Sequence, residues 1–86
     1  MVAVFAPEDY IEADITTEEK ELSFEHEVTQ VAILSKVDCY VKFESRDRKA
    51  IFHPANLIFI WHVPCRRLYV KAVSESGKFY AWGEII

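Results

Sequence analysis

The sequence predicts an all-β fold: an antiparallel β-sandwich or jelly-roll-like small barrel of seven or eight short strands, with little or no helix. Three observations support this prediction. Apolar and polar residues alternate along most of the chain, which is typical of strands with one buried face. Turn residues interrupt the alternation roughly every 8–12 residues, as in sandwiches and barrels. No segment has the apolar stripe of a crossover helix between strands.

Length and composition indicate a single small folded domain. The chain has 86 residues, of which 51% are hydrophobic and 14% aromatic, with only two Gly and three Pro. Such a composition excludes a disordered or linker-dominated chain. We predict one β-sandwich domain over residues 1–86, in which residues 1–19 form a partly extended N-terminal arm. Because a small domain buries a modest share of its surface, some apolar surface is expected to lie against a partner.

The first half of the chain contains four predicted strands. A short acidic strand near residues 11–16 leads into a charged connection. Residues 20–26 follow, with Leu22 and Phe24 on one face, and residues 28–34 are a more apolar run. Residues 37–43 alternate most clearly, because every second residue from Val37 to Phe43 is apolar.

The middle of the chain holds a loop, a short strand and a turn. A polar loop over residues 44–49 precedes a strand at residues 50–52. Pro54 ends this strand because proline cannot donate to a ladder. The tetrapeptide His53-Pro54-Ala55-Asn56 is predicted to be a turn.

Residues 57–63 give the strongest structural indication. Their sequence, LIFIWHV, places apolar side chains on both faces of one strand. A strand with one wet face should alternate. Either another part of the domain covers its outer side, or a second subunit does.

The last two predicted strands, residues 67–73 and 78–84, are joined by Ser74-Glu75-Ser76-Gly77. We predict that they form a hairpin in which Tyr69 faces Trp82 and Lys71 faces Tyr80. Its other face, which carries Leu68, Val70, Ala72, Phe79 and Ala81, is assigned to the core. The predicted partner or ligand surface comprises Trp61, His62, Tyr69, Lys71, Tyr80 and Trp82.

Charge, cysteine content and the absence of long apolar stretches limit the partners and the cellular location that we expect. The formal charge is −4, whereas nucleic-acid binding usually needs a clustered basic excess, so we predict no nucleic-acid partner. The two cysteines, Cys39 and Cys65, do not make a disulfide framework, and we expect free thiols in a reducing compartment, although a bridge between them stays open. No apolar stretch is long enough for a membrane span, and residues 1–7 lack the basic region of a signal peptide. We predict neither membrane contact nor signal-peptide secretion.

No motif indicates catalysis or a cofactor. The histidines, His26, His53 and His62, fall one to a segment, which does not match metal-ligand spacing. Cys65 and His62 are the nearest nucleophile–base pair, but no glycine elbow accompanies them, and a structural cysteine is the simpler interpretation. We therefore predict a protein that is not an enzyme, with no cofactor and no metal site.

Residues 51–83 resemble a known group of proteins. A short strand, the HPAN turn, an apolar strand and the run VPCRRLYVKAVSESGKFYAWGE are similar to small β-sandwich structural proteins of tailed bacteriophages. The resemblance extends over about residues 20–86, although such turns more often carry Gly where His53 and Asn56 stand. It implies a virion component made in the host cytoplasm, such as a head decoration, head-completion or tail-associated protein. Its partners would be further copies of itself and other virion proteins.

Two other functions stay open. A small carbohydrate-binding module would use Tyr69, Tyr80 and Trp82 as stacking platforms and Lys71 as a polar clamp. A small metal-dependent β-barrel enzyme would need a bound metal. The expected mechanism of a structural protein is different, because it buries apolar strand faces against a neighbour.

Overall fold

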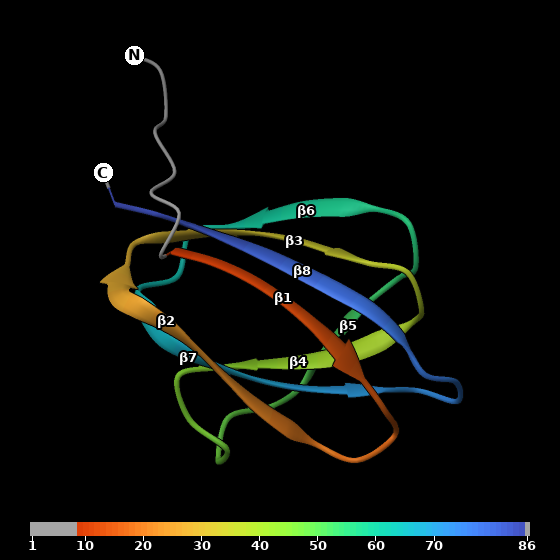
Figure 1. Ribbon diagram of the computed structural model, residues 1–86. Helices are drawn as coiled ribbons and strands as arrows, with labels where there is room; N and C mark the ends of the chain where they lie inside the picture. The colour runs from red at the N-terminus through yellow and green to blue at the C-terminus, as the bar shows by residue number, and fades with distance from the viewer. Residues whose placement is uncertain (1–8, 86) are drawn as a thin grey trace.

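The computed structural model describes residues 9–85 and contains two four-stranded antiparallel sheets (Figure 1). The first sheet has the strand order β1-β8-β3-β6 and the second has the order β2-β7-β4-β5. The strands are β1 (Tyr10–Ile15), β2 (Lys20–Val28), β3 (Gln30–Ser35), β4 (Cys39–Phe43), β5 (Ile51–His53), β6 (Ile58–Trp61), β7 (Cys65–Ala72) and β8 (Gly77–Glu84). Each predicted strand overlaps one of these eight, and the predicted all-β fold is confirmed.

The topology is that of a jelly roll. Only β4 and β5 are both consecutive in sequence and paired, and the other ladders join distant strands: β1 with β8, β2 with β7, β3 with β6 and β8, and β4 with β7. The chain therefore passes repeatedly from one sheet to the other, as in two Greek keys. No helix of the described residues is long and apolar enough to cross a membrane.

The core lies between the two sheets. Alternate residues of each strand point inward and are nearly inaccessible to solvent, including Ile15, Phe24, Ile33, Leu68 and Phe79. Burying a side chain of this size stabilises the fold by about 1.5–3 kcal/mol. At Gly83 a Cβ atom would lie 2.5 Å from Val28 Cγ1, so a glycine is needed for this close approach.

The predicted hairpin between residues 67–73 and 78–84 is wrong. Strand β7 pairs with β2 and β4, whereas β8 pairs with β1 and β3 in the opposite sheet. The assignment of faces holds, since Leu68, Val70, Ala72, Phe79 and Ala81 are all buried. The alternation of a strand determines which side faces the core but not which strand lies next to it. β7 and β8 lie in opposite sheets, and the apolar face of each strand packs against the same core.

The turn at residues 53–56 forms as predicted. His53 Nε2 lies 2.9 Å from the carbonyl oxygen of Leu57, and Asn56 adopts φ = 63°. The Asn56 amide donates to the carbonyl of Ser35 at 2.7 Å, and the Ala55 amide donates to Asp38 at 2.8 Å. These bonds hold the connection by which the chain passes from β5 to β6.

The predicted N-terminal arm divides into two parts. Residues 10–15 are β1, a full strand at one edge of the first sheet. Residues 1–8 lie outside the described residues. The charged connection expected after the first strand lies between β1 and β2.

Candidate functional site

The two sheets have outer faces of different chemistry. On the face of β2-β7-β4-β5 a polar network surrounds Tyr69, and a smaller aromatic pair, Tyr40 and the 48% exposed Phe52, lies on β4 and β5. Tyr69 of β7 is 6% exposed because the Arg46 guanidinium lies 5.2 Å from its ring centre. The Tyr69 hydroxyl donates to Glu21 at 2.8 Å, and this hydrogen bond, followed by burial, raises the Tyr69 pKa. Glu19 holds Lys42 at 3.0 Å and Arg46 at 3.9 Å. Tyr69 is thus unavailable to a partner.

The outer face of β1-β8-β3-β6 is apolar across all four strands. In antiparallel ladders, directly opposed residues share a face. One row aligns Tyr10, Trp82, Ala32 and Ile60, and the next aligns Tyr80, Leu34 and Ile58, with the charged Glu12 at its β1 end. We call these seven residues the outer apolar face: Tyr10, Ala32, Leu34, Ile58, Ile60, Tyr80 and Trp82.

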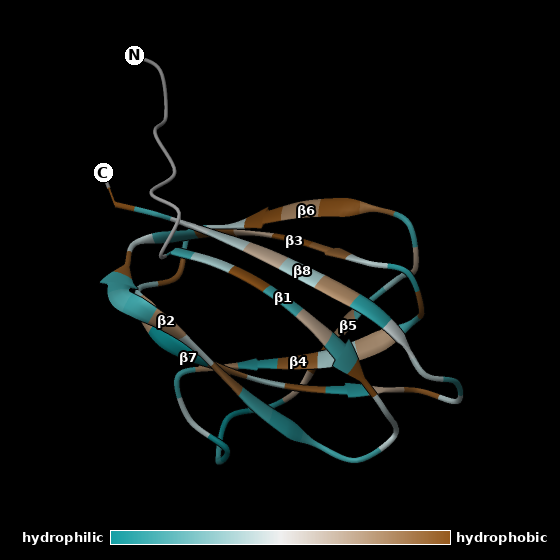
Figure 2. Ribbon diagram, in the orientation of Figure 1, coloured by the Kyte–Doolittle hydropathy of each residue, from teal (hydrophilic) through white to brown (hydrophobic). Residues whose placement is uncertain are grey.

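Strand β6 is the most exposed part of this face. Ile58 is 62% exposed and Ile60 is 56% exposed, whereas Ala32 and Leu34 on the neighbouring β3 are half-buried. Figure 2 shows β6 as a hydrophobic strand and β2, in the opposite sheet, as mostly hydrophilic. Because β6 is the last strand of its sheet, its outer edge has no partner strand among the described residues. An exposed apolar edge of this kind favours association with another chain.

Three aromatic rings continue the outer apolar face across β8 and β1. The ring centroids of Tyr80 and Trp82 are 6.2 Å apart and their planes differ by 17°. Tyr10 lies 5.6 Å from Trp82. The polar border beside them contains Glu12, which accepts a hydrogen bond from the Tyr10 hydroxyl at 3.1 Å, and the Lys78–Asp14 ion pair at 3.0 Å. An apolar centre with a polar border is the usual anatomy of a protein contact.

The six predicted surface residues are divided among four places. Tyr80 and Trp82 belong to the outer apolar face, while Tyr69 and Lys71 lie on the other sheet. Trp61 is half-buried and packs on Phe43 at 5.8 Å between the ring centroids. His62 is exposed after the end of β6. The predicted single surface that combines Tyr69 with Trp82 is therefore wrong, because it depended on the hairpin.

Sequence reasoning missed the other residues of the outer apolar face. The missing members include Tyr10, Ala32 and Leu34. Their alternation with buried neighbours was visible in the sequence, but only the pairing of β8 with both β1 and β3 brings them beside Trp82. Ile58 and Ile60 were visible as the second apolar face of residues 57–63.

The nucleophile and metal candidates lie apart from this face. Cys65 is buried, and burial, with smaller contributions from Glu44 and Glu27, raises its pKa to about 12. Its thiol is therefore protonated near neutral pH and is a poor nucleophile. Both cysteines are free, and the described residues contain no group of three His, Cys, Asp or Glu side chains placed to hold a metal ion.

Comparisons with known proteins bear on the fold alone. No protein-family model matches this chain, and no curated protein matches it. A solved structure described as an RmlC-like cupin protein from Desulfovibrio desulfuricans matches with a TM-score of 0.54 and 13% sequence identity. The match covers 98% of this chain and 80% of that one. It supports the jelly-roll assignment, and jelly rolls occur in capsid proteins, lectins and cupins alike.

Proposed function

We propose that this protein is a non-enzymatic assembly protein that forms a closed homo-oligomer through its outer apolar face. We further propose that it serves as a structural component of a bacteriophage virion, at a head decoration, head-completion or tail-associated position. The observation that carries the proposal is the outer apolar face, which has one row across all four strands and a second row across β8, β3 and β6, with Glu12 and the Lys78–Asp14 pair as its charged border.

Burial of this face in a contact between two copies is physically favourable. Large exposed apolar patches on small proteins mark interaction sites. A second copy that stacks its own outer apolar face on the first would remove Ile58, Ile60 and the aromatic rings from water. A twofold dimer is the simplest closed arrangement, because the same surface then serves both partners.

The virion part of the proposal has separate support. It comes from the resemblance of residues 20–86 to small phage structural proteins and from the use of jelly rolls in viral capsids. A fold alone does not select a function, so this part needs its own test. If it is correct, purified particles of the phage that encodes this sequence contain the chain at a fixed copy number. Absence of the chain from purified particles would overturn it.

The non-enzymatic part is supported by the engagement of the reactive side chains. His53 Nε2 is used in the turn at Leu57, and His26 lies 3.4 Å from Asp9. The Cys65 thiol is buried with a pKa of about 12. His53 and Cys65 are therefore inaccessible to a substrate at the surface, whereas His26 and His62 are exposed.

The assembly proposal is tested by native mass spectrometry of the purified chain together with a Trp82→Ala variant. We expect a multiple of the 10.0 kDa chain for the native protein and a shift toward the single chain for the variant. The shift should not depend on added sugar. A native protein that stays at 10.0 kDa over the accessible concentration range would overturn the proposal.

A glycan-binding module is a second candidate, favoured by the three contiguous rings of Tyr10, Tyr80 and Trp82. Aromatic planes stack on the apolar faces of sugars, and Glu12 lies beside them as a polar group. Such a module would remain monomeric, and its tryptophan fluorescence would respond to saccharides. The response would be lost in Trp82→Phe.

A further inference from the structure

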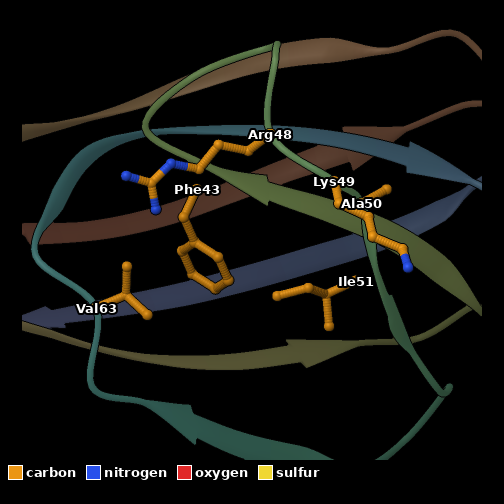
Figure 3. A pocket seen from close by; sticks show the side chains of 6 residues that line it. All are labelled: Phe43, Arg48, Lys49, Ala50, Ile51 and Val63. Atoms are coloured by element: carbon orange, nitrogen blue, oxygen red, sulfur yellow. The ribbon is translucent and has the colours of Figure 1, made fainter.

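A second apolar feature lies at one end of the sandwich, away from the outer apolar face. A cavity of about 550 Å³ opens where β4 ends and β5 begins. Figure 3 shows the Phe43 ring at its centre, with Val63 on one side and Ile51 on the other. Ala50 completes the apolar lining, and the loop before β5 adds Arg48 and Lys49. The size falls within the range of about 300–1,000 Å³ that is typical of small-molecule sites.

Six of the ten Lys and Arg side chains form no ion pair with a described residue, and Arg48 and Lys49 are the two of these that line the cavity. Arg46 and Arg67 each face a carboxylate, at 3.9 Å from Glu19 and 3.7 Å from Glu44. Neither Arg48 nor Lys49 forms an ion pair with any residue of the described chain. A protein with net charge −4 therefore presents two unneutralised positive charges beside an apolar cavity.

These features together define the ligand by its chemistry. An apolar lining contributes little binding free energy to a fully polar anion, and unpaired cations contribute little to the binding of a neutral hydrocarbon. We propose that the cavity binds a small amphiphilic carboxylate, with the apolar tail over Phe43 and between Ile51 and Val63. The carboxylate lies at Arg48, whose guanidinium fork can hold both oxygens. Figure 3 shows the Lys49 amine on the other side of the Phe43 ring, where it adds positive charge to the opposite border of the cavity.

This site does not depend on the proposed function. Its lining residues belong to β4, the β4–β5 loop, the start of β5 and the segment after β6, and none is part of the outer apolar face. Loss of assembly and loss of ligand binding are therefore separable by mutation.

Isothermal titration of the full chain with decanoate tests the proposal. We expect saturable binding of one decanoate per chain, and affinity that falls by up to about fourfold for each methylene removed between decanoate and hexanoate. Decanol, which lacks the charge, and acetate, which lacks the tail, should each bind at least roughly tenfold more weakly.

Matched variants locate the site. Arg48→Gln combined with Lys49→Gln should weaken decanoate binding by roughly tenfold or more, because two charge-assisted hydrogen bonds are lost. Lys36→Gln combined with Lys71→Gln removes the same charge from exposed positions outside the cavity and should leave binding unchanged. Ala50→Phe should abolish binding by filling the cavity.

Three results would overturn the proposal. The first is no saturable binding of decanoate to the native chain. The second is equal binding by the native chain and the Arg48/Lys49 double variant. The third is loss of binding in Ile58→Thr combined with Ile60→Thr, since that result would place the ligand on the outer apolar face.

Discussion

Substitution of the two isoleucines that β6 exposes should dissociate the oligomer without unfolding the chain. Ile58→Thr combined with Ile60→Thr removes two carbon groups from each side chain but keeps the branched Cβ that suits a strand. Each buried carbon group contributes about 0.8 kcal/mol. A partner can cover the 62% of Ile58 and the 56% of Ile60 that are exposed. Weighted by these fractions and counted over both copies of a dimer, the lost free energy of association is about 4 kcal/mol. The dimer Kd should therefore rise by about three orders of magnitude.

Sedimentation equilibrium over a wide concentration range measures this change. Ile85→Thr is the matched control, because Ile85 is 58% exposed but lies beyond β8 and outside the outer apolar face. We expect the control to associate as the native chain does, and all three proteins to show similar thermal unfolding as monomers. An unchanged association constant for the double variant would refute the assignment of this face as the interface.

Three further predictions concern the interior and the polar face. Burial lowers the His53 pKa below its ordinary value of 6.5, so the unfolded chain binds more protons at this site than the folded chain does. The free energy of unfolding should be constant above about pH 6.5 and should fall as the pH drops through and below that value. Chemical denaturation of His53→Gln should show a smaller decrease at low pH. Identical pH profiles for the variant and the native chain would contradict this account. Cys65 should resist alkylation by iodoacetamide at pH 8 until the protein unfolds, and rapid labelling of the native chain, measured by mass spectrometry, would show that its thiol is not buried with a raised pKa. Tyr69→Phe should lower the free energy of unfolding through loss of the Glu21 bond, and no change in the denaturation midpoint would mean that this bond is weak.

The sequence was sufficient for the fold class and for the inward side of the strands that alternate. Period-two alternation in residues 37–43 and 67–73 reports burial directly, because successive side chains of a strand point to opposite faces. The buried state of Leu68, Phe79 and Ala81 follows from that rule. Residues 57–63 broke the rule, and they lie at the exposed edge of a sheet.

The pairing of strands could not be predicted in the same way. The predicted strands at residues 67–73 and 78–84 are separated by a four-residue turn, which favours a hairpin by local geometry. Long-range pairing overrides this local preference, since β1 and β3 cover both edges of β8 while β2 and β4 cover both edges of β7. The composition of the outer apolar face depends on those pairings. So does the position of the cavity beside Phe43, which joins residues from separate parts of the chain.

The mass of the native chain in solution tests the central claim most directly. Native mass spectrometry at micromolar concentration should give a defined multiple of 10.0 kDa, with a dimer near twice that mass as the simplest case. The same multiple should appear by sedimentation equilibrium. At roughly 100 µM even a weak dimer with a Kd of about 10⁻⁵ M would form. A 10.0 kDa monomer in both measurements up to that concentration would contradict the claim that the outer apolar face is an assembly surface.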